Sequence, residues 1–262
     1  MSKPYMTRTL TTHYSVTVEL HADTEKAKIL AKRFSLPFSK HLDKSHHQLV
    51  FSNKHIEMRT PSLIKPVRID FTEGKNAHRR SFGGGRGQPL AKAVGMKKGK
   101  IPTIIDATAG YGRDAFVLAT LGSHVTLVER NPLIAALLED AISKANIEPT
   151  TTQIAQRMVL IYFDAHQYLA ELTPEERPDV IYIDPMYPTR HKSALVKKEM
   201  QLLHQLVGPD TDSRELLDMA LQTAKKRVVV KRPKLADPIT DYKPSTFVES
   251  KNTRYDIYLQ IQ

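Results

Sequence analysis

The spacing of apolar residues along the chain changes near Pro102. Beyond that point, short apolar runs alternate with segments whose apolar residues recur every three or four positions. Alternation of strand and helix is typical of a mostly parallel sheet with helices on both faces. The apolar runs predict strands at 103–105, 125–129, 158–163, 180–183 and 228–231, and the helical spacing predicts helices at 114–121, 133–145, 194–207 and 213–224.

The end of the chain has the pattern of a hairpin. Apolar runs at 247–250 and 254–260 flank Lys251 and Asn252, which are turn-compatible residues. These two strands would pair antiparallel at one edge. We therefore expect an α/β fold in which a mostly parallel, seven-stranded sheet ends in an antiparallel C-terminal hairpin.

The N-terminal part of the chain has a different pattern. Short strands are predicted at 15–20, 48–52, 55–59 and 67–71, and a helix at 23–34 with Thr24 as its candidate N-cap. We expect a small α+β unit over residues 1–75, a basic connector rich in Gly and Arg over 76–101, and the α/β domain over 102–262. No run approaches the roughly 18 apolar residues of a membrane helix, and the first 20 residues do not resemble a secretory signal.

Basic residues are concentrated in three segments of a chain whose net charge is +11. Segments 65–100, 189–200 and 225–234 carry ten, four and six Lys or Arg against two, one and no acidic residues. Charge gathered in this way favours a face that binds a polyanion, although solvated lysines on an ordinary surface are the alternative.

Cysteine is absent, which excludes disulfides and thiolate metal sites and fits a cytoplasmic enzyme. The eleven histidines have no metal-ligand spacing. We therefore expect no structural or catalytic metal.

A glycine-rich loop follows the first strand of the α/β domain. Gly110 and Gly112 stand within the segment 106–114, DATAGYGRD, and glycine permits the tight turn and close ligand approach that such a loop needs. Glu129 lies nineteen residues after Gly110, at the end of the next predicted strand. A carboxylate there can accept hydrogen bonds from both ribose hydroxyls of a nucleoside cofactor.

Acidic residues around this loop distinguish between two cofactors. A dinucleotide places its pyrophosphate on the helix N-terminus, where Asp114 would repel it. S-adenosylmethionine has no phosphate and carries an amino group and a sulfonium, so Asp106 and Asp114 suit it better than they suit NAD. As structural alternatives, Asp114 could serve as a helix cap and Asp106 as a turn residue. Asp164, after the third strand, could read the adenine amino group or be a solvated loop acid.

The segment 184–188, DPMYP, closes the fourth predicted strand of the domain. Ligands of such folds bind beyond the carboxyl ends of the strands, so this segment would face the methyl donor. The Asp184 carboxylate and the Pro185 carbonyl could accept both N–H groups of an exocyclic base amine, and Tyr187 could stack on the base. The alternative is a strand-ending turn with a buried tyrosine. Transfer would depend mainly on alignment of nitrogen, methyl and sulfur.

Several motifs together resemble a known family. They are AHRRSFGGGRG at 77–87, DATAG at 106–110, ERNP at 129–132, DPMYP at 184–188, KSALVKKEM at 192–200 and KRVVVKRP at 226–233. The chain from about Val67 onward is similar to the bacterial 16S ribosomal RNA guanine-N2 methyltransferases of the RsmJ type. The resemblance implies a Rossmann-like class I methyltransferase domain, S-adenosylmethionine as cofactor, a cytoplasmic location, and transfer of one methyl group to N2 of a guanine in 16S rRNA. It assigns cofactor binding to Arg113, Asp114, Glu129, Arg130, Asp164, Ala165 and Asp184.

Basic residues near these motifs are candidates for RNA contacts. The loop containing Arg79, Arg80 and Arg86 could track phosphates and close over the site, or could be a solvated linker. Lys192, Lys197 and Lys198 follow Tyr187, and Lys231 and Arg232 end the fifth predicted strand on the same ligand-facing rim. The expected partner is 16S rRNA or the small ribosomal subunit.

Two other functions remain open from the sequence. Asp-Pro-x-Tyr also serves N6-adenine methylation of RNA or DNA. A non-catalytic RNA-binding or assembly factor could retain the same fold, although Asp184 and Tyr187 are both present and argue against it.

Overall fold

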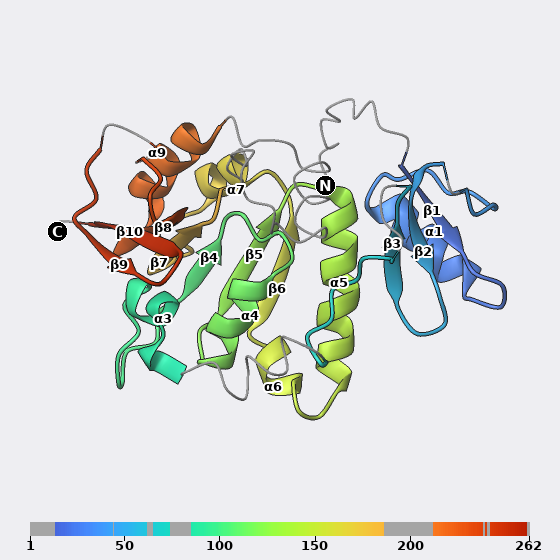
Figure 1. Cartoon of the computed structure of the whole chain (residues 1–262), viewed down its shortest axis with the longest axis horizontal. Helices are drawn as coiled ribbons and strands as arrows, with labels where there is room; N and C mark the ends of the chain where they lie inside the picture. Colours follow the sequence, from blue (N-terminus) through green and yellow to red (C-terminus); the bar gives the residue numbers. More distant parts are fainter. Residues whose placement is uncertain are drawn as a thin grey trace. The chain divides into compact units, whose positions relative to one another are not determined.

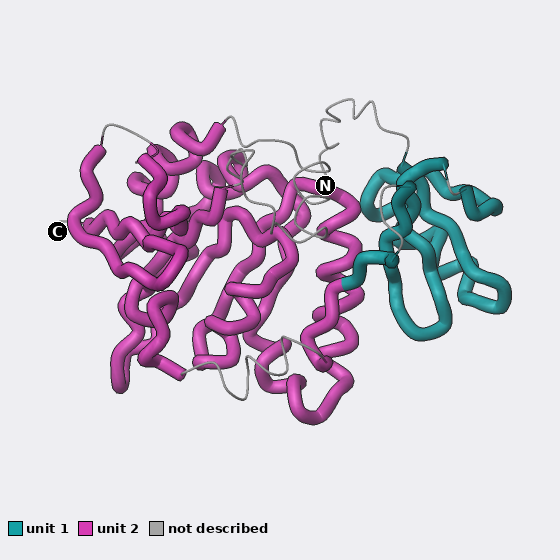
Figure 2. Tube along the Cα trace, viewed as in Figure 1, with its two compact units in different colours: residues 1–68 teal, residues 69–262 magenta. Residues whose placement is uncertain are grey.

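A computed structural model of the chain describes residues 14–43, 45–61, 65–73, 85–185, 212–237, 239 and 242–260. The chain forms two compact units, Met1–Arg68 and Ile69–Gln262, which Figure 2 shows in different colours. The three-part division expected from the sequence, with a connector at 76–101, remains a proposal.

The first unit is a three-stranded sheet with one helix. Its elements are β1 (Tyr14–Val18), α1 (Thr24–Arg33), β2 (His47–Phe51) and β3 (Ile56–Arg59). The strand order is β1-β2-β3, with β1 parallel and β3 antiparallel to β2. The α1 crossover joins the two parallel strands, as parallel pairing requires.

Two local expectations for this unit were wrong. The N-cap of α1 is Asp23, whose carboxylate accepts the Lys26 N–H at 3.0 Å, while Thr24 is the first helical residue. Residues 67–71 do not form a strand, because only Val67 bridges to Met58. Phe71 instead belongs to the second unit, where it is fully buried and its ring stacks on Phe116 at 4.7 Å.

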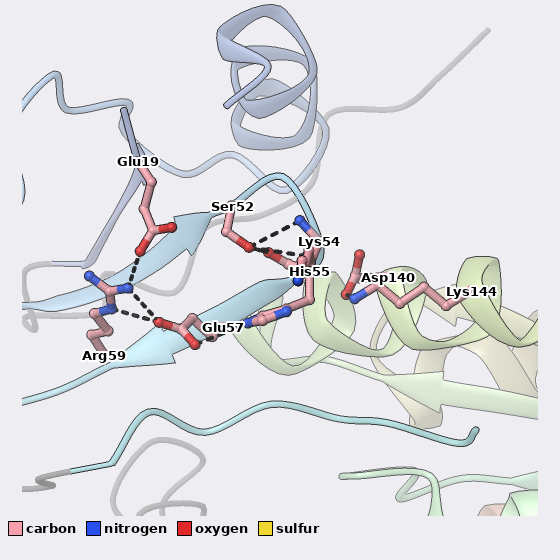
Figure 3. Close-up of polar contacts among 8 residues, drawn as sticks. All are labelled: Glu19, Ser52, Lys54, His55, Glu57, Arg59, Asp140 and Lys144. Carbon is pink, nitrogen blue, oxygen red and sulfur yellow. Dashed lines mark hydrogen bonds and ion pairs between the residues drawn. The ribbon is translucent and has the colours of Figure 1, made fainter. Parts of the chain in front are cut away.

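A row of charged side chains lies along β3. Arg59 donates to Glu57 at 2.7 Å and also pairs with Glu19, while His55 contacts Glu57 at 3.2 Å (Figure 3). Most of this row is exposed to solvent in part, so it contributes little to the stability of the unit.

The second unit contains the seven-stranded sheet, whose strands are β4 (Ile104–Asp106), β5 (Val125–Glu129), β6 (Met158–Tyr162), β7 (Val180–Ile183), β8 (Arg227–Pro233), β9 (Thr246–Glu249) and β10 (Thr253–Leu259). Its helices are η1 (Gly85–Gly87), α3 (Pro89–Ala93), α4 (Arg113–Thr120), α5 (Pro132–Ile147), α6 (Thr152–Ala155), α7 (Ala165–Glu171) and α9 (Ser213–Thr223). The helix predicted at 194–207 lies outside the described residues. The sequence missed α3, α6 and α7, because each is too short to show helical periodicity.

The sheet has the strand order β6-β5-β4-β7-β8-β10-β9 (Figure 1). The five strands from β6 to β8 are parallel, and β10 joins β8 and β9 antiparallel. This confirms the expected fold, including the C-terminal hairpin. The order reverses between β4 and β7, and at such a switch point two loops diverge and leave a crevice for ligands.

Helices cover the sheet on two sides. Ile105, Ile181, Val228 and Tyr258 point to one face and pack with Leu217 and its neighbours on α7 and α9. The next residue along each strand points to the opposite face, which α4 and α5 cover beside β5 and β6. In the described part of the chain, no helix is both long enough and apolar enough to cross a bilayer.

Candidate cofactor and catalytic site

The loop between β4 and α4 is shaped by two glycines with positive φ. Gly110 has φ 50° and Gly112 has φ 65°, a left-handed conformation that other residues adopt with strain. A Cβ on Gly112 would lie 2.8 Å from Leu138 Cδ2 and 3.0 Å from Phe71 Cζ. The helix start therefore packs directly on the core, and only glycine fits there.

Glu129 holds this loop from the end of β5. One carboxylate oxygen accepts the Gly110 N–H at 2.9 Å and the other accepts the Asn131 N–H at 2.7 Å. The residue is 6% exposed, so it lies in a low-dielectric environment. A carboxylate has about four acceptor positions, so Glu129 can bind the loop and also accept from hydroxyl groups of a ligand.

Three aspartates and one lysine meet at the carboxyl ends of β4, β7 and β8. The Lys231 ammonium lies 2.7 Å from Asp184 Oδ2 and 2.8 Å from Asp114 Oδ2. Asp106 is the last residue of β4, is 2% exposed, and accepts the Thr108 N–H at 3.2 Å. Charged groups of both signs are thus gathered at the switch point of the sheet.

The register of the sheet explains why these side chains share one face. Asp106 is paired with Tyr182, Tyr182 with Val229, and Lys231 with Tyr255, and paired residues point the same way. Side chains two residues apart on a strand also share a face, which adds Asp184 to Tyr182. All of them therefore point toward the side from which α4 brings Asp114.

Sequence reasoning missed two polar residues of this cluster. Tyr182 donates its hydroxyl to Asp114 at 2.8 Å, and Thr108 Oγ1 accepts the Asp184 N–H at 2.6 Å. The position of Tyr182, two residues before Asp184, was an available signal for the first. No sequence signal indicated the second, because the contact joins residues 76 positions apart.

Electrostatics separate the protonation states within the cluster. Burial raises the pKa of Asp106 well above its ordinary value, and the nearby charges of Asp114 and Asp184 add to the shift. Burial also raises the pKa of Tyr182, so its hydroxyl stays a neutral donor. Burial would lower the pKa of Lys231, but the carboxylates of Asp114 and Asp184 outweigh it and raise that pKa, so the ammonium stays charged.

The remaining expected cofactor residues lie around the ends of β5 and β6. Arg113 begins α4 with its guanidinium 5.3 Å from the centre of the Tyr111 ring. Arg130 donates to Asp212 at 2.6 Å and lies 4.0 Å from Asp164. Asp164 is the N-cap of α7, where it accepts the Gln167 N–H at 3.2 Å, and Ala165 is the first residue of that helix.

The two basic residues expected to contact RNA from β8 both make contacts within the protein or are buried. Lys231 is bonded to carboxylates within the cluster, and Arg232 is 5% exposed. RNA contact by either residue therefore stays a prediction from the sequence. Arg86, in η1, is exposed as expected for an RNA contact. Tyr187, Arg79, Arg80, Lys192, Lys197 and Lys198 lie outside the described residues.

The donor set fits S-adenosylmethionine better than a dinucleotide. Glu129 offers carboxylate oxygens for hydroxyl groups, and the carboxyls near the α4 N-terminus suit the amino group and sulfonium. Among the described residues, no three His, Asp or Glu side chains are grouped so as to hold a metal ion.

Comparison with known proteins gives a consistent result. A family model described as "Putative SAM-dependent methyltransferase" matches residues 29–260. Ribosomal RNA small subunit methyltransferase J of Chromobacterium violaceum is 48% identical over 240 residues, covering 91% of this chain and 93% of the relative. The protein of the same name from Aeromonas salmonicida is 50% identical over 239 residues, covering 89% and 92%.

A solved structure shares the whole architecture. The crystal structure of a SAM-dependent methyltransferase from Neisseria gonorrhoeae has a TM-score of 0.76 and 37% identity to this chain. The match covers 94% of this chain and 95% of the other.

Proposed function

The chain belongs to the family of S-adenosylmethionine-dependent methyltransferases that includes ribosomal RNA small subunit methyltransferase J, and on this basis we propose that it methylates the exocyclic N2 amine of a guanine in 16S rRNA. Its cofactor is S-adenosylmethionine. The proposal rests most directly on Asp184, which the fold places at the carboxyl end of β7 beside the glycine loop. The expected setting of this reaction is the bacterial cytoplasm, where the small ribosomal subunit is made.

S-adenosylmethionine supplies a methyl group on a positively charged sulfonium. Glu129 would accept hydrogen bonds from the ribose hydroxyls, and Asp164 with Ala165 would lie at the adenine. The Asp114 carboxylate supplies negative charge near the amino group and the sulfonium, and Asp106, whose pKa burial raises well above its ordinary value, offers a hydrogen-bonding carboxyl beside it. None of these roles needs a diphosphate group on the ligand.

Asp184 and Pro185 would prepare the amine for attack. The nitrogen lone pair of an exocyclic amine is delocalised into the base, which makes it a poor nucleophile. Acceptance of its two N–H groups by the Asp184 carboxylate and the Pro185 carbonyl favours a pyramidal nitrogen with a more available lone pair. Tyr187, assigned from the sequence, would stack on the base and hold it in line. Pro185 is buried, which restricts the motion of its carbonyl.

Exposed basic residues would hold the RNA backbone. Arg86 is exposed on η1, and Arg79, Arg80, Lys192, Lys197 and Lys198 are further candidates from the sequence. Contacts of this kind fix the position of the RNA without reading its sequence. Selection of one guanine then depends on the shape of the RNA substrate, which is either naked 16S rRNA or an assembled small subunit.

The modified nucleoside can be identified directly. Cells that lack the protein should lose one N2-methylguanosine from small-subunit rRNA when the RNA is digested and its nucleosides are measured by mass spectrometry. Expression of the wild-type chain should restore it and Asp184→Ala should not. Asp184→Asn should restore more than Asp184→Ala, because an amide oxygen can still accept one amine N–H.

Other outcomes would replace the proposal. Loss of N6-methyladenosine in place of N2-methylguanosine would establish the adenine-modifying alternative. An unchanged set of RNA nucleosides would show that the protein does not modify rRNA and would favour a non-catalytic binding role.

A further inference from the structure

Lys231 occupies an unusual position for a residue expected to bind phosphates. Its ammonium lies 2.7 Å from Asp184 Oδ2 and 2.8 Å from Asp114 Oδ2, and 28% of its side-chain surface is exposed. Both partners are carboxylates of the site, one on the strand-end loop after β7 and one on α4. An ammonium with two short ionic hydrogen bonds has little capacity left for a phosphate.

The ammonium also compensates the negative charge of the neighbouring aspartates. Asp106, Asp114 and Asp184 all lie on one face of the sheet, and the nearby Tyr182 supplies no charge because burial raises its pKa. Like-charged carboxylates in such proximity cannot all ionise unless a cation compensates them. In the described part of this cluster, Lys231 is the cation bonded to both Asp114 and Asp184.

We propose that Lys231 is a positioning residue for the methyl transfer, holding the Asp184 carboxylate ionised and in place by tethering it to Asp114. This inference rests on the proposed function, because there the Asp184 carboxylate accepts one N–H group of the amine. The raised pKa of Lys231 keeps its ammonium charged through the physiological range, so Lys231 does not act as the base. Its effect on the reaction therefore passes through Asp184.

The proposal predicts a change in pH dependence with a definite sign. A cation within hydrogen-bond distance lowers the pKa of a carboxyl, so removal of the ammonium raises the pKa of Asp184. As the pH is lowered, activity that needs the Asp184 carboxylate is therefore lost at a higher pH than in the wild type. Among the residues that the structure describes, the other groups that face Lys231 are Asp106 on β4, Asp114 on α4, Tyr182 on β7 and Tyr255 on β10. Burial raises the pKa of Tyr182, so this hydroxyl is neutral over the same range.

The test compares Lys231→Met with Lys231→Arg and with Lys234→Met. Lys234 lies just after β8 and makes an exposed ion pair with Glu249 at 3.0 Å, so it controls for loss of a lysine at this strand end. For Lys231→Met we expect kcat to fall by about 10- to 100-fold, the scale of a misplaced catalytic group. We expect the acid limb of its kcat profile to move up by about 1 pH unit. Lys231→Arg should keep the acid limb of the wild type, and Lys234→Met should change neither kcat nor the acid limb.

Binding measurements separate positioning from phosphate contact. For Lys231→Met, KM for RNA and the slope of RNA affinity against salt should both stay close to the wild-type values. An unchanged acid limb together with a higher KM and a salt slope shallower by about 1 would overturn the proposal and assign Lys231 to a phosphate.

A readout independent of catalysis keeps the proposal distinct from the function itself. The carboxyl carbons of labelled aspartate can be titrated by NMR in the unliganded protein. Lys231→Met should raise the midpoints of two aspartates, Asp114 and Asp184, because both lose the same cation. The Asp184 signal is identified by its loss in Lys231→Met with Asp184→Asn. If Lys231→Met does not fold, the same titration of Asp114→Asn applies. Removal of one carboxylate there should leave the Asp184 midpoint at or below its wild-type value, and a raised midpoint would overturn the proposal.

Discussion

Glu129 shows how one side chain can organise a loop and serve a ligand. One carboxylate oxygen accepts the backbone N–H of Gly110 in the loop, and the other accepts the backbone N–H of Asn131, two residues after the strand end. The positive φ of Gly110 points its N–H toward β5, where Glu129 ends the strand. The acid expected from spacing to bind ribose is therefore also part of the loop's own structure.

Removal of the Glu129 carboxylate should weaken cofactor binding. Glu129→Ala should lose about 1.5–3 kcal/mol of binding free energy for S-adenosylmethionine, the range for hydrogen bonds to a charged group. Calorimetric titration measures the affinity, and circular dichroism confirms that the variant is folded. Glu171→Ala removes an exposed carboxylate at the end of α7 and should bind normally. Unchanged affinity in folded Glu129→Ala would exclude Glu129 from the cofactor site.

At the scale of elements, one ion pair on β10 also organises a neighbouring segment of the chain. Asp256 on β10 is fully buried, and Arg254 on the same face donates to its two oxygens at 2.7 and 3.1 Å. Arg254 also donates to the Ala236 carbonyl at 3.0 Å and the Lys234 carbonyl at 3.2 Å. This ion pair therefore ties the segment after β8 to the strand that completes the sheet beside it. The hydrogen bond to Asp256 outweighs burial and raises the pKa of Arg254, so the guanidinium stays charged.

Breaking this pair from one side should destabilise the second unit. Arg254→Met leaves the buried Asp256 carboxylate without its cation and should lower the free energy of unfolding by about 3–5 kcal/mol. Arg254→Met combined with Asp256→Asn should lose less, because the amide carries no buried charge. Urea unfolding of the two variants and the wild type measures the difference. Equal losses in both variants would show that the carboxylate charge is not the cause.

At the scale of the whole molecule, charge along the chain overstates the basic surface. The segment 225–234 carries six bases and no acid, which suggested a polyanion-binding stripe. Within it, Arg232 is buried, Lys231 pairs with carboxylates of the site, and the Arg227 guanidinium packs against Gly95 and donates to the Ala93 carbonyl at 3.3 Å. Half of these bases therefore stabilise the fold or the site, and the basic loop before the domain becomes the stronger candidate for RNA.

Replacement of that loop's arginines tests the RNA contact. Arg79→Gln, Arg80→Gln and Arg86→Gln together should weaken RNA binding, and each lost phosphate contact should reduce the salt slope by about 0.7–0.9. Cofactor affinity should remain nearly intact. RNA affinity is measured at several salt concentrations.

The matched control for this variant removes three other exposed bases. This control carries Lys97→Gln, Lys98→Gln and Lys100→Gln. The three lysines lie before β4, at the amino ends of the parallel strands and away from the switch point. They should change the salt slope less than the arginine variant. An equal slope in the arginine variant and the wild type would make the loop a linker.

Local patterns predicted most of the second unit. The expected bounds of β5 and β7 match the structure, those of β6 differ from it by one residue at one end, and those of β4 and α4 differ by one residue at both ends. These elements are visible in the sequence because each buries an apolar face whose period the backbone sets. The short helix α7 and the misassigned strand at 67–71 were beyond this signal. The helix has fewer than two full turns of pattern, and Phe71 is buried by distant Phe116 and not by its own strand partner.

The sequence by itself determined the order of the sheet strands and of the helices α4, α5 and α9 in the second unit, the glycine loop, and the acids at the ends of β4 and β5. Each of these depends on neighbours within a few residues, whose sterics and periodicity are written in the chain. Only the tertiary structure decided the roles of Lys231, Tyr182 and Thr108. Their partners are 47 to 117 residues away. These residues come together because β7 pairs with β4, and β8 pairs with β7, in one particular register. A shift of that register by one residue would turn Lys231 to the opposite face of the sheet, so its place in the site is a property of the packed sheet.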